Sequence, residues 1–470
     1  IGVTTLSLIP DPASFRDPCG RVFKKNKRIF RLISELGARD YKIVRDTKFL
    51  SRMAGLDKMI EASEVDPAIL EAPDLNPQVV LEHPFLPFIS YPYEWCFPMM
   101  KKAALLHLEL QTLALGENLM FSDASAYNIQ FKGPQPIFID YLSVRPYREG
   151  QIWEGHRQFC EQFLNPLLLR SLLGVVHNAW YRGSLEGIPS DELCKMLPWY
   201  KKFSRNLFLH VVLPSRLNNL AQSEKKGSLS GLSHKLPKAT LKKIFTQLHS
   251  WINKLNPLSS SNSTWADYGS MHCYESEEIV KKQNFVADFI QSTKPKMVWD
   301  LGCNTGEYSE LALESGATQV IGFDFDQAVL EKAFERAEKN NLNFLPLFFD
   351  GANPSPDQGW NNQERQSFLK RKNADAVLAL AFEHHLAIGR NIPLDQFVDW
   401  FVSLAPCGVV EFIPKEDPNL KLMLSLREDI FFDYNENAFR NLLEQKCRIV
   451  RSQIISKTGR KLYWFERPGT

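Results

Sequence analysis

In the C-terminal part of the chain, short apolar runs of strand length alternate with segments whose apolar residues recur at helical spacing. Apolar strands that alternate with amphipathic helices are typical of a parallel sheet with helices on both faces. We therefore predict an α/β domain with a doubly wound, Rossmann-like sheet over residues 264–470. The strands that the pattern places are 297–300, 319–324, 344–349, 374–381 and 407–413.

The N-terminal region has a different pattern. Residues 15–33 contain two apolar runs separated by Lys-Lys-Asn-Lys, which predicts a β-hairpin. Residues 98–117 and 238–255 have the apolar spacing of amphipathic helices. We expect the first part of the chain to form an α+β domain of its own.

A change of composition at residues 222–263 divides the chain. This segment is rich in serine, lysine and glycine, which is typical of linkers and loops. We expect a linker with one helix here and an N-terminal domain over residues 1–221. Within that domain we expect a strand-rich lobe over about 1–90 and a helical lobe over about 91–221.

Charge and cysteine usage restrict the class of protein. The formal net charge is +2 over 470 residues, which gives no strong sign of nucleic-acid binding. The eight cysteines form no Cys-x-x-Cys pair, and no histidine joins them at the usual zinc spacing. We therefore expect buried thiols, no metal and a reducing, cytoplasmic compartment. The sequence shows no apolar run of membrane-spanning length and no signal-peptide pattern at its start.

The first predicted strand runs into a glycine loop that opens a helix. The loop reads Asp300-Leu-Gly302-Cys-Asn304-Thr-Gly306. Glycines let the backbone approach a ligand, and a helix start adds free N–H groups. A dehydrogenase loop would read G-x-G-x-x-G and would suit a pyrophosphate. The spacing found here fits a nucleoside ligand without a phosphate better.

This loop resembles motif I of the class I S-adenosylmethionine (SAM)-dependent methyltransferases, D-x-G-x-G-x-G. Asn304 is a mild departure, because asparagine tolerates unusual backbone angles. The resemblance implies a seven-stranded sheet and SAM as cofactor, with its amino acid end at Asp300, Gly302, Asn304 and Gly306.

Two acids and one aromatic residue complete the expected cofactor site. Asp324 ends the second strand, where a carboxylate lies beside the ribose hydroxyls of a bound nucleoside. Asp350 follows the third strand and is well placed for the adenine amino group. Tyr274 belongs to an aromatic segment that precedes the glycine loop, and we expect it to cover the cofactor.

The acceptor should lie over the carboxyl ends of the fourth and fifth strands. Methyl transfer is an in-line displacement, and an oxygen acceptor also needs a base. His385 is the preferred base because an imidazole titrates near neutrality, and His384 and Glu411 are further candidates. A metal held by Glu383 and the two histidines is disfavoured, because neighbouring residues on a strand point to opposite faces.

A second pattern of polar residues lies in the N-terminal region. Asp123 and Asn128 share one loop, and Asp140 follows after a predicted hairpin. Protein kinases and small-molecule phosphotransferases have a similar layout, in which an aspartate positions the acceptor hydroxyl. The asparagine and the second aspartate hold magnesium. The resemblance implies a kinase-like domain that binds ATP and Mg²⁺.

This segment also departs from the kinase pattern. The usual histidine before Asp123 is absent, and the hairpin offers one glycine, Gly20, where a phosphate-covering loop has several. Kinases also carry a lysine on a strand of the N-terminal lobe that contacts the ATP phosphates. No residue here clearly corresponds to it, and Lys42 and Arg31 are the candidates. A degenerate lobe that presents the methyl acceptor is the intermediate interpretation.

Most of the chain resembles a bacterial group that includes the rhizobial nodulation host-specificity methyltransferases. A more distant likeness is to O-antigen chain-terminating proteins, which join the two domains in the opposite order. The resemblance implies SAM-dependent methylation of an oxygen on a glycan or small molecule. A bifunctional kinase–methyltransferase and a SAM-binding scaffold without turnover are the alternatives. The matching stretches are 86–95, 122–128, 300–306, 349–356, 378–388 and 411–417.

Overall fold

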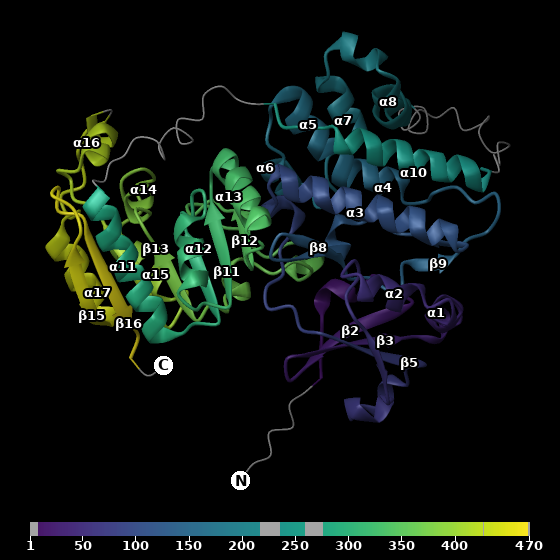
Figure 1. Cartoon of the computed structure of the whole chain (residues 1–470), viewed down its shortest axis with the longest axis horizontal. Helices are drawn as coiled ribbons and strands as arrows, with labels where there is room; N and C mark the ends of the chain where they lie inside the picture. The colour runs from purple at the N-terminus through teal and green to yellow at the C-terminus, as the bar shows by residue number, and fades with distance from the viewer. Residues whose placement is uncertain (1–7, 217–235, 259–275, 426, 469–470) are drawn as a thin grey trace.

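The computed structural model describes residues 8–216, 236–258, 276–425 and 427–468. Figure 1 shows an α/β domain, green to yellow, beside a second body. In that body a strand-rich lobe, purple, lies below a helical lobe, blue to teal. Within the described ranges, no helix combines the length and the apolar character needed to cross a membrane.

The strand-rich lobe contains β1 (Ile9–Pro10), β2 (Gly20–Lys25), β3 (Arg28–Ile33), β4 (Ser63–Val65) and β5 (Val79–His83), with α1 (Glu35–Asp46) and α2 (Phe49–Gly55) between β3 and β4. Its antiparallel sheet has the order β1-β2-β3-β5-β4. The β2–β3 hairpin turns at Asn26 and Lys27, whose φ angles are 54° and 60°. Positive φ at both turn residues matches the twist of a two-stranded ribbon. The predicted hairpin is confirmed.

The helical lobe contains α3 (Phe97–Gly116), α4 (His156–Phe159), α5 (Asn165–Leu173), α6 (Asn178–Gly183), α7 (Ser190–Met196), α8 (Arg205–Leu207) and the short strands β6 (Leu119–Phe121), β7 (Ile129–Lys132), β8 (Gln135–Phe138) and β9 (Val144–Pro146). Two π-helical turns, η6 (Cys160–Leu164) and η8 (Phe208–Val212), continue α4 and α8. The amphipathic helix expected in the linker, α10 (Lys238–Asn253), packs along α3 (Figure 1). It therefore covers the helical lobe.

Short 3-10 turns connect these elements at Pro12–Ser14, Pro67–Leu70, Pro73–Leu75, Pro92–Glu94, Ala126–Asn128, Trp199–Phe203, Trp360–Asn362 and Leu369–Arg371. Most of them begin beside a proline or polar residue that presets or caps the first turn. The turn at 126–128 places Asn128 in the loop that also carries Asp123.

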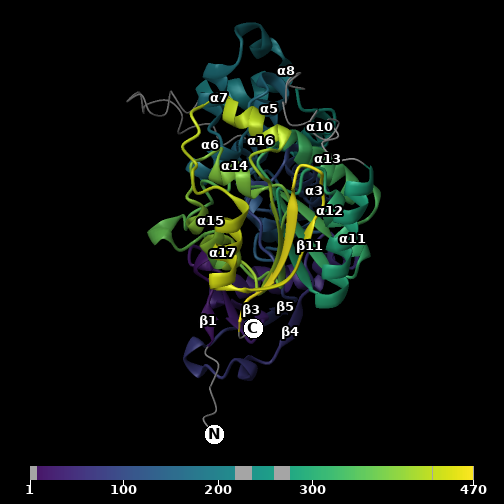
Figure 2. The same cartoon turned by 90° about the vertical axis from the view of Figure 1, so that its left-hand side faces the viewer.

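The α/β domain contains β10 (Met297–Leu301), β11 (Gln319–Asp324), β12 (Phe344–Phe348), β13 (Ala376–Ala379), β14 (Cys407–Phe412), β15 (Arg448–Ile454) and β16 (Lys461–Glu466). Its helices are α11 (Ser276–Thr293), α12 (Glu307–Glu314), α13 (Gln327–Lys339), α14 (Glu383–Ala387), α15 (Leu394–Val402), α16 (Pro418–Ser425) and α17 (Glu436–Lys446). Figure 2 shows the sheet between α11 to α13 on one side and α15 and α17 on the other.

The sheet has seven strands in the order β12-β11-β10-β13-β14-β16-β15, which confirms the predicted architecture. The strands β10 to β14 are parallel, and β16 is antiparallel to both of its neighbours. Because β11 and β13 flank β10, the carboxyl end of β10 is a topological switch point, where such sheets bind ligands.

The predicted fourth strand is too long. The strand β13 ends at Ala379, and Ala381 has a φ of 53°, which interrupts the extended backbone. Residues 383–387 then form α14. His384 and His385 are therefore helical, and the strand alternation invoked against a metal there does not apply.

A buried ion pair joins the two domains. The Arg371 guanidinium of the α/β domain donates to Glu94 at 2.9 Å and to the Ile89 carbonyl at 2.7 Å. Arg371 is 7% exposed and Glu94 is 5% exposed. Nearby, the Phe88 ring meets the Trp299 ring edge to face at 5.9 Å. The domains thus share apolar contacts and a desolvated charge pair.

Candidate functional site

The glycine loop lies at the switch point and has the backbone that the sequence predicts. Gly302 and Gly306 have φ angles of 74° and 83°, and Asn304 has a φ of 48°. The N–H groups of Gly302 and Cys303 donate to the Phe323 carbonyl at 2.8 and 3.0 Å. These bonds tie the loop to β11, so that the side of the loop bearing Asn304 faces solvent.

The structure brings Asp324 directly against this loop. Its two carboxylate oxygens accept hydrogen bonds from the N–H groups of Asn304 and Asp326, both at 2.9 Å. Burial raises the pKa of Asp324 to about 6, and the backbone donors oppose that rise. Asp350 follows β12, is half-exposed and accepts from the Ala352 N–H at 3.1 Å. Both acids lie on the ligand edge of the sheet.

Phe382 was missed by the sequence analysis and forms a wall of this site. A Cβ atom on Gly302 would lie 3.2 Å from the Phe382 ring, and one on Gly351 would lie 3.0 Å from it. The Phe382 ring therefore packs against two backbone positions at which any side chain larger than that of glycine would collide with it. The sequence signal that could have identified Phe382 is its position at the end of an apolar predicted strand. The solvent-facing glycine loop, the carboxylates of Asp324 and Asp350 and the wall formed by Phe382 together fit the nucleoside and amino acid ends of SAM.

Asp300 takes a different position from the other predicted cofactor residues. It is 1% exposed and accepts from the Ser309 hydroxyl at 2.6 Å. Burial raises its pKa to about 6. This hydrogen bond connects the end of β10 to α12. Direct contact between Asp300 and the cofactor stays a prediction. Tyr274 lies outside the described residues.

The two predicted histidines lie side by side, with ring centroids 4.1 Å apart. Burial lowers the pKa of His385 to about 4 and that of His384 well below its usual range. The argument that His385 titrates near neutrality is therefore wrong for this environment. Both imidazoles are neutral at physiological pH, so either can still accept a proton.

Glu411, the third predicted catalytic residue, is fully buried in β14. Its carboxylate lies 2.7 Å from the Lys282 ammonium and 3.9 Å from the Arg460 guanidinium. The structure thus places it between two cations of α11 and of the segment before β16. A role as base stays a prediction.

Glu383 and Tyr434 form a buried polar contact beside these residues. The Tyr434 hydroxyl is 2.9 Å from both Glu383 oxygens and 2.7 Å from the Ile413 carbonyl. One hydroxyl proton cannot serve three acceptors. A protonated Glu383 resolves this, in agreement with its pKa, which burial raises to about 8. Perturbed carboxyls of this kind gather at functional sites.

The N-terminal polar residues also converge. The Asn128 amide donates to Asp123 at 2.9 Å, and the Arg31 guanidinium of β3 lies 2.7 Å from Asp140. All four line a cavity of about 1020 Å³ that is enclosed by both lobes and by residues 359–373 of the α/β domain. Burial, and secondarily Asp140, raises the pKa of Asp123. The other candidate for the strand cation, Lys42, is exposed on α1.

SAM affinity is expected to weaken as the pH falls. In the predicted cofactor site, ribose hydroxyls would donate to an ionised Asp324, and burial raises the pKa of this carboxyl to about 6. Between pH 7.5 and pH 5 the Kd should rise about tenfold, because the ionised fraction falls by that factor. Calorimetric titration across this range checks it. Asp324→Asn, which cannot titrate, should show a flat profile, and an equal slope in this variant would contradict the assignment.

Gly306→Ala is expected to destabilise the α/β domain by about 1–3 kcal/mol. The new Cβ would lie 2.5 Å from the buried Phe344 ring, at a φ of 83°. Gly316→Ala is the matched control, because Gly316 also has a positive φ (117°) but has open space around it. Urea unfolding of both variants separates the clash from the backbone strain. Equal losses would show that the packing argument is wrong.

The sheet order, the glycine loop and the flanking carboxylates of the α/β domain are together the pattern of class I SAM-dependent methyltransferases. The solved structures that it resembles include the N-methyltransferase NodS from Bradyrhizobium japonicum WM9. That match has 10% identity and a TM-score of 0.31, and it covers 41% of this chain and 98% of that one.

Magnesium protoporphyrin IX methyltransferase (ChlM) from Synechocystis PCC 6803 matches with 18% identity and a TM-score of 0.30, covering 49% of this chain and 99% of that one. No family model matches the chain.

The sequence of the chain matches a known protein with much higher identity and over nearly its whole length. Over 455 residues the chain is 46% identical to nodulation protein NoeA of Rhizobium meliloti (strain 1021). The aligned part covers 97% of this chain and 95% of that protein, so both domains are included. The chain therefore belongs to the family of nodulation protein NoeA.

Proposed function

We propose that this protein transfers the methyl group of SAM to an oxygen of a glycan or small molecule. The observation that carries the proposal is the contact between Asp324 and the glycine loop at Asn304, at the switch point of the sheet. The resemblance of the sequence to the rhizobial nodulation methyltransferase group implies a glycan-type acceptor.

Residues of the chain would bind SAM and hold it in position for methyl transfer. SAM, when bound, supplies an electrophilic methyl group on a sulfonium. Asp324 would accept hydrogen bonds from the ribose hydroxyls, Asp350 would hold the adenine amino group, and Gly302 and Asn304 would hold the amino acid end. Phe382, which packs against Gly302 and Gly351, would form the apolar wall of the site. Holding the reactants in line contributes much of the rate of such a displacement.

The acceptor proton needs a base at the carboxyl ends of β13 and β14. His385 is the proposed base, since its neutral imidazole can accept a proton at physiological pH. His384 packs against its ring and would limit its orientation. Glu411 would act on the acceptor only indirectly, because Lys282 occupies its carboxylate.

Incubation with methyl-labelled SAM and fractionated cell extract tests the proposal. We expect label to enter one glycan or small-molecule fraction, and to be lost with Asp324→Ala. The matched control is Asp399→Ala, which removes an exposed carboxylate on α15. Label in a protein or nucleic-acid fraction would refute the acceptor class. SAM binding without any labelled product would favour a scaffold.

A second candidate function concerns the N-terminal domain, which we propose to be kinase-like. The proposal is supported by Asp123, Asn128 and Asp140, which line one cavity where both lobes meet the α/β domain. Arg31 on β3, one of the two candidates for the strand cation, would take the place of the kinase lysine. Its ion pair with Asp140 partly neutralises the carboxylate that would hold Mg²⁺. Nucleotide binding, or presentation of the methyl acceptor, fits this pairing better than rapid phosphotransfer.

Titration of the whole chain with ATP and Mg²⁺ tests this second function. We expect binding that Asp140→Asn abolishes and Asp46→Asn preserves, since Asp46 is an exposed acid at the end of α1 that does not line the cavity. Absence of ATP binding to the unmodified chain would reject the nucleotide interpretation.

A further inference from the structure

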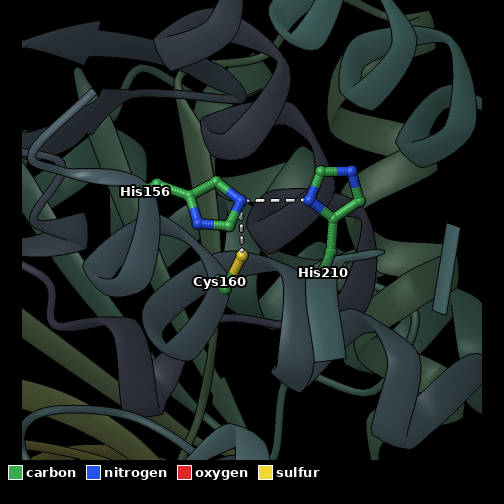
Figure 3. Close-up of side chains that lie close together, drawn as sticks. All are labelled: His156, Cys160 and His210. Atoms are coloured by element: carbon green, nitrogen blue, oxygen red, sulfur yellow. Dashed lines mark hydrogen bonds between the residues drawn. The ribbon is translucent and has the colours of Figure 1, made fainter. Parts of the chain in front are cut away.

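Three donor side chains meet inside the helical lobe, away from both sites described above. Figure 3 shows His156, Cys160 and His210 pointing toward one another. The Nε2 atom of His156 is 3.0 Å from Nδ1 of His210 and 3.7 Å from the sulfur of Cys160. All three donor atoms lie within 4.8 Å of one another. No other group of this kind occurs among the described residues.

The spacings match those of a tetrahedral cation site. Zinc lies about 2.0–2.1 Å from imidazole nitrogen and about 2.3 Å from thiolate sulfur. At tetrahedral angles, two such nitrogens are about 3.3 Å apart, and a nitrogen and a sulfur are about 3.6 Å apart. The observed separations, 3.0 and 3.7 Å, differ from these by a few tenths of an ångström. Small side-chain rotations would therefore admit an ion.

We infer that His156, Cys160 and His210 form a binding site for a zinc-type divalent cation. Two imidazoles and one thiolate are borderline-soft donors, which suit Zn²⁺ and Co²⁺ better than Mg²⁺ or Ca²⁺. Three protein ligands leave one coordination position for a water or another ligand. Binding releases the thiol proton of Cys160 to solvent, because the thiolate is the metal ligand.

Local backbone geometry builds the cluster. His156 and Cys160 are four residues apart and lie on one helical face, where α4 passes into the π-turn η6. His210 lies in the second π-turn, η8. Such turns are rare and occur frequently at functional sites. Here Cys160 begins one such turn, and His210 lies within the other.

Aromatic rings surround the donors. The Trp153 ring meets His156 edge to face at 5.5 Å, and the Trp251 ring of α10 lies 6.1 Å from His210. Cys160 is 1% exposed. A largely dry shell of this kind strengthens the attraction between a cation and its ligands. The cation would tie α4 to η8 under α10, and so would stabilise the helical lobe.

A metal-free cluster is the competing explanation. One imidazole can donate to the other, and the thiol can complete the contact. In that arrangement, however, a single atom, Nε2 of His156, serves both neighbours. A ligand set instead needs three donor atoms around a common centre, and the mutual separations of these atoms, all within 4.8 Å, allow one. The sequence alone does not predict it, because His210 is 54 residues beyond His156.

Titration of the whole, chelator-treated chain with Co²⁺ tests the inference. We expect one bound ion per chain, a thiolate-to-cobalt charge-transfer band, and displacement by Zn²⁺. Cys160→Ser should remove the band and weaken binding at least about tenfold. Cys194→Ser, which alters a half-buried thiol of α7 outside the cluster, should change neither.

Thermal unfolding provides a second readout if Cys160→Ser folds poorly. Zn²⁺ should raise the Tm of the unmodified chain and leave that of His210→Gln unchanged. The inference is overturned if the unmodified chain shows no thiolate band at saturating Co²⁺. It is also overturned if Zn²⁺ shifts the Tm of His210→Gln as much as that of the unmodified chain.

Discussion

Glu94→Ala is expected to lower the free energy of unfolding by about 3–5 kcal/mol. The substitution leaves Arg371 as a charge without its partner at the buried contact between the domains, where the pair is 5% and 7% exposed. The carbonyl of Ile89 and the face of Tyr91, 4.5 Å from the guanidinium, compensate only in part. Chemical unfolding followed by circular dichroism measures the loss.

An exposed ion pair of the same type provides the control. Glu117 pairs with Arg52 on the surface, and both side chains are at least a third exposed. Glu117→Ala should therefore cost at most about 1 kcal/mol. The double variant Glu94→Leu with Arg371→Met should recover much of the loss, because no buried charge remains. A loss below about 1 kcal/mol for Glu94→Ala would mean that water reaches this contact.

Asp324→Ala should raise the Kd for SAM by about 10- to 100-fold. Hydrogen bonds to an ionised partner contribute on the order of 1.5–3 kcal/mol, and 1.4 kcal/mol is a factor of ten in affinity. The variant also removes the acceptor of the Asn304 N–H and so loosens the glycine loop. Calorimetric titration with SAM gives the ratio directly.

The isosteric variant separates these two effects. Asp324→Asn keeps one acceptor oxygen for the loop and loses the charge, so its affinity should lie between those of the parent and Asp324→Ala. Asp399→Ala should leave the Kd unchanged, because that carboxylate pairs with Lys446 on the outer surface. Unchanged affinity in Asp324→Ala would place the ribose elsewhere.

Local patterns were enough to predict the α/β domain. Each of the first five strands is an apolar run that ends in a turn, and Asp324 follows from the position of its strand relative to the glycine loop. The β2–β3 hairpin was equally visible, because its turn chemistry and both its strands lie within one short segment. These features depend on neighbours in the chain.

The remaining features depend on distant residues. Glu94 and Arg371 are 277 residues apart, and nothing in either segment indicates the other. The low pKa of His385 and the raised pKa of Glu383 follow from burial, which depends on the complete packing of α14. The extent of β13 was misjudged because Ala381 adopts a positive φ that alanine rarely takes.

Calorimetric titration of the whole chain with SAM tests the central claim most directly. We expect one SAM bound per chain, at the carboxyl end of β10, with competition by S-adenosylhomocysteine. A folded chain that binds no SAM at millimolar concentration would contradict the account.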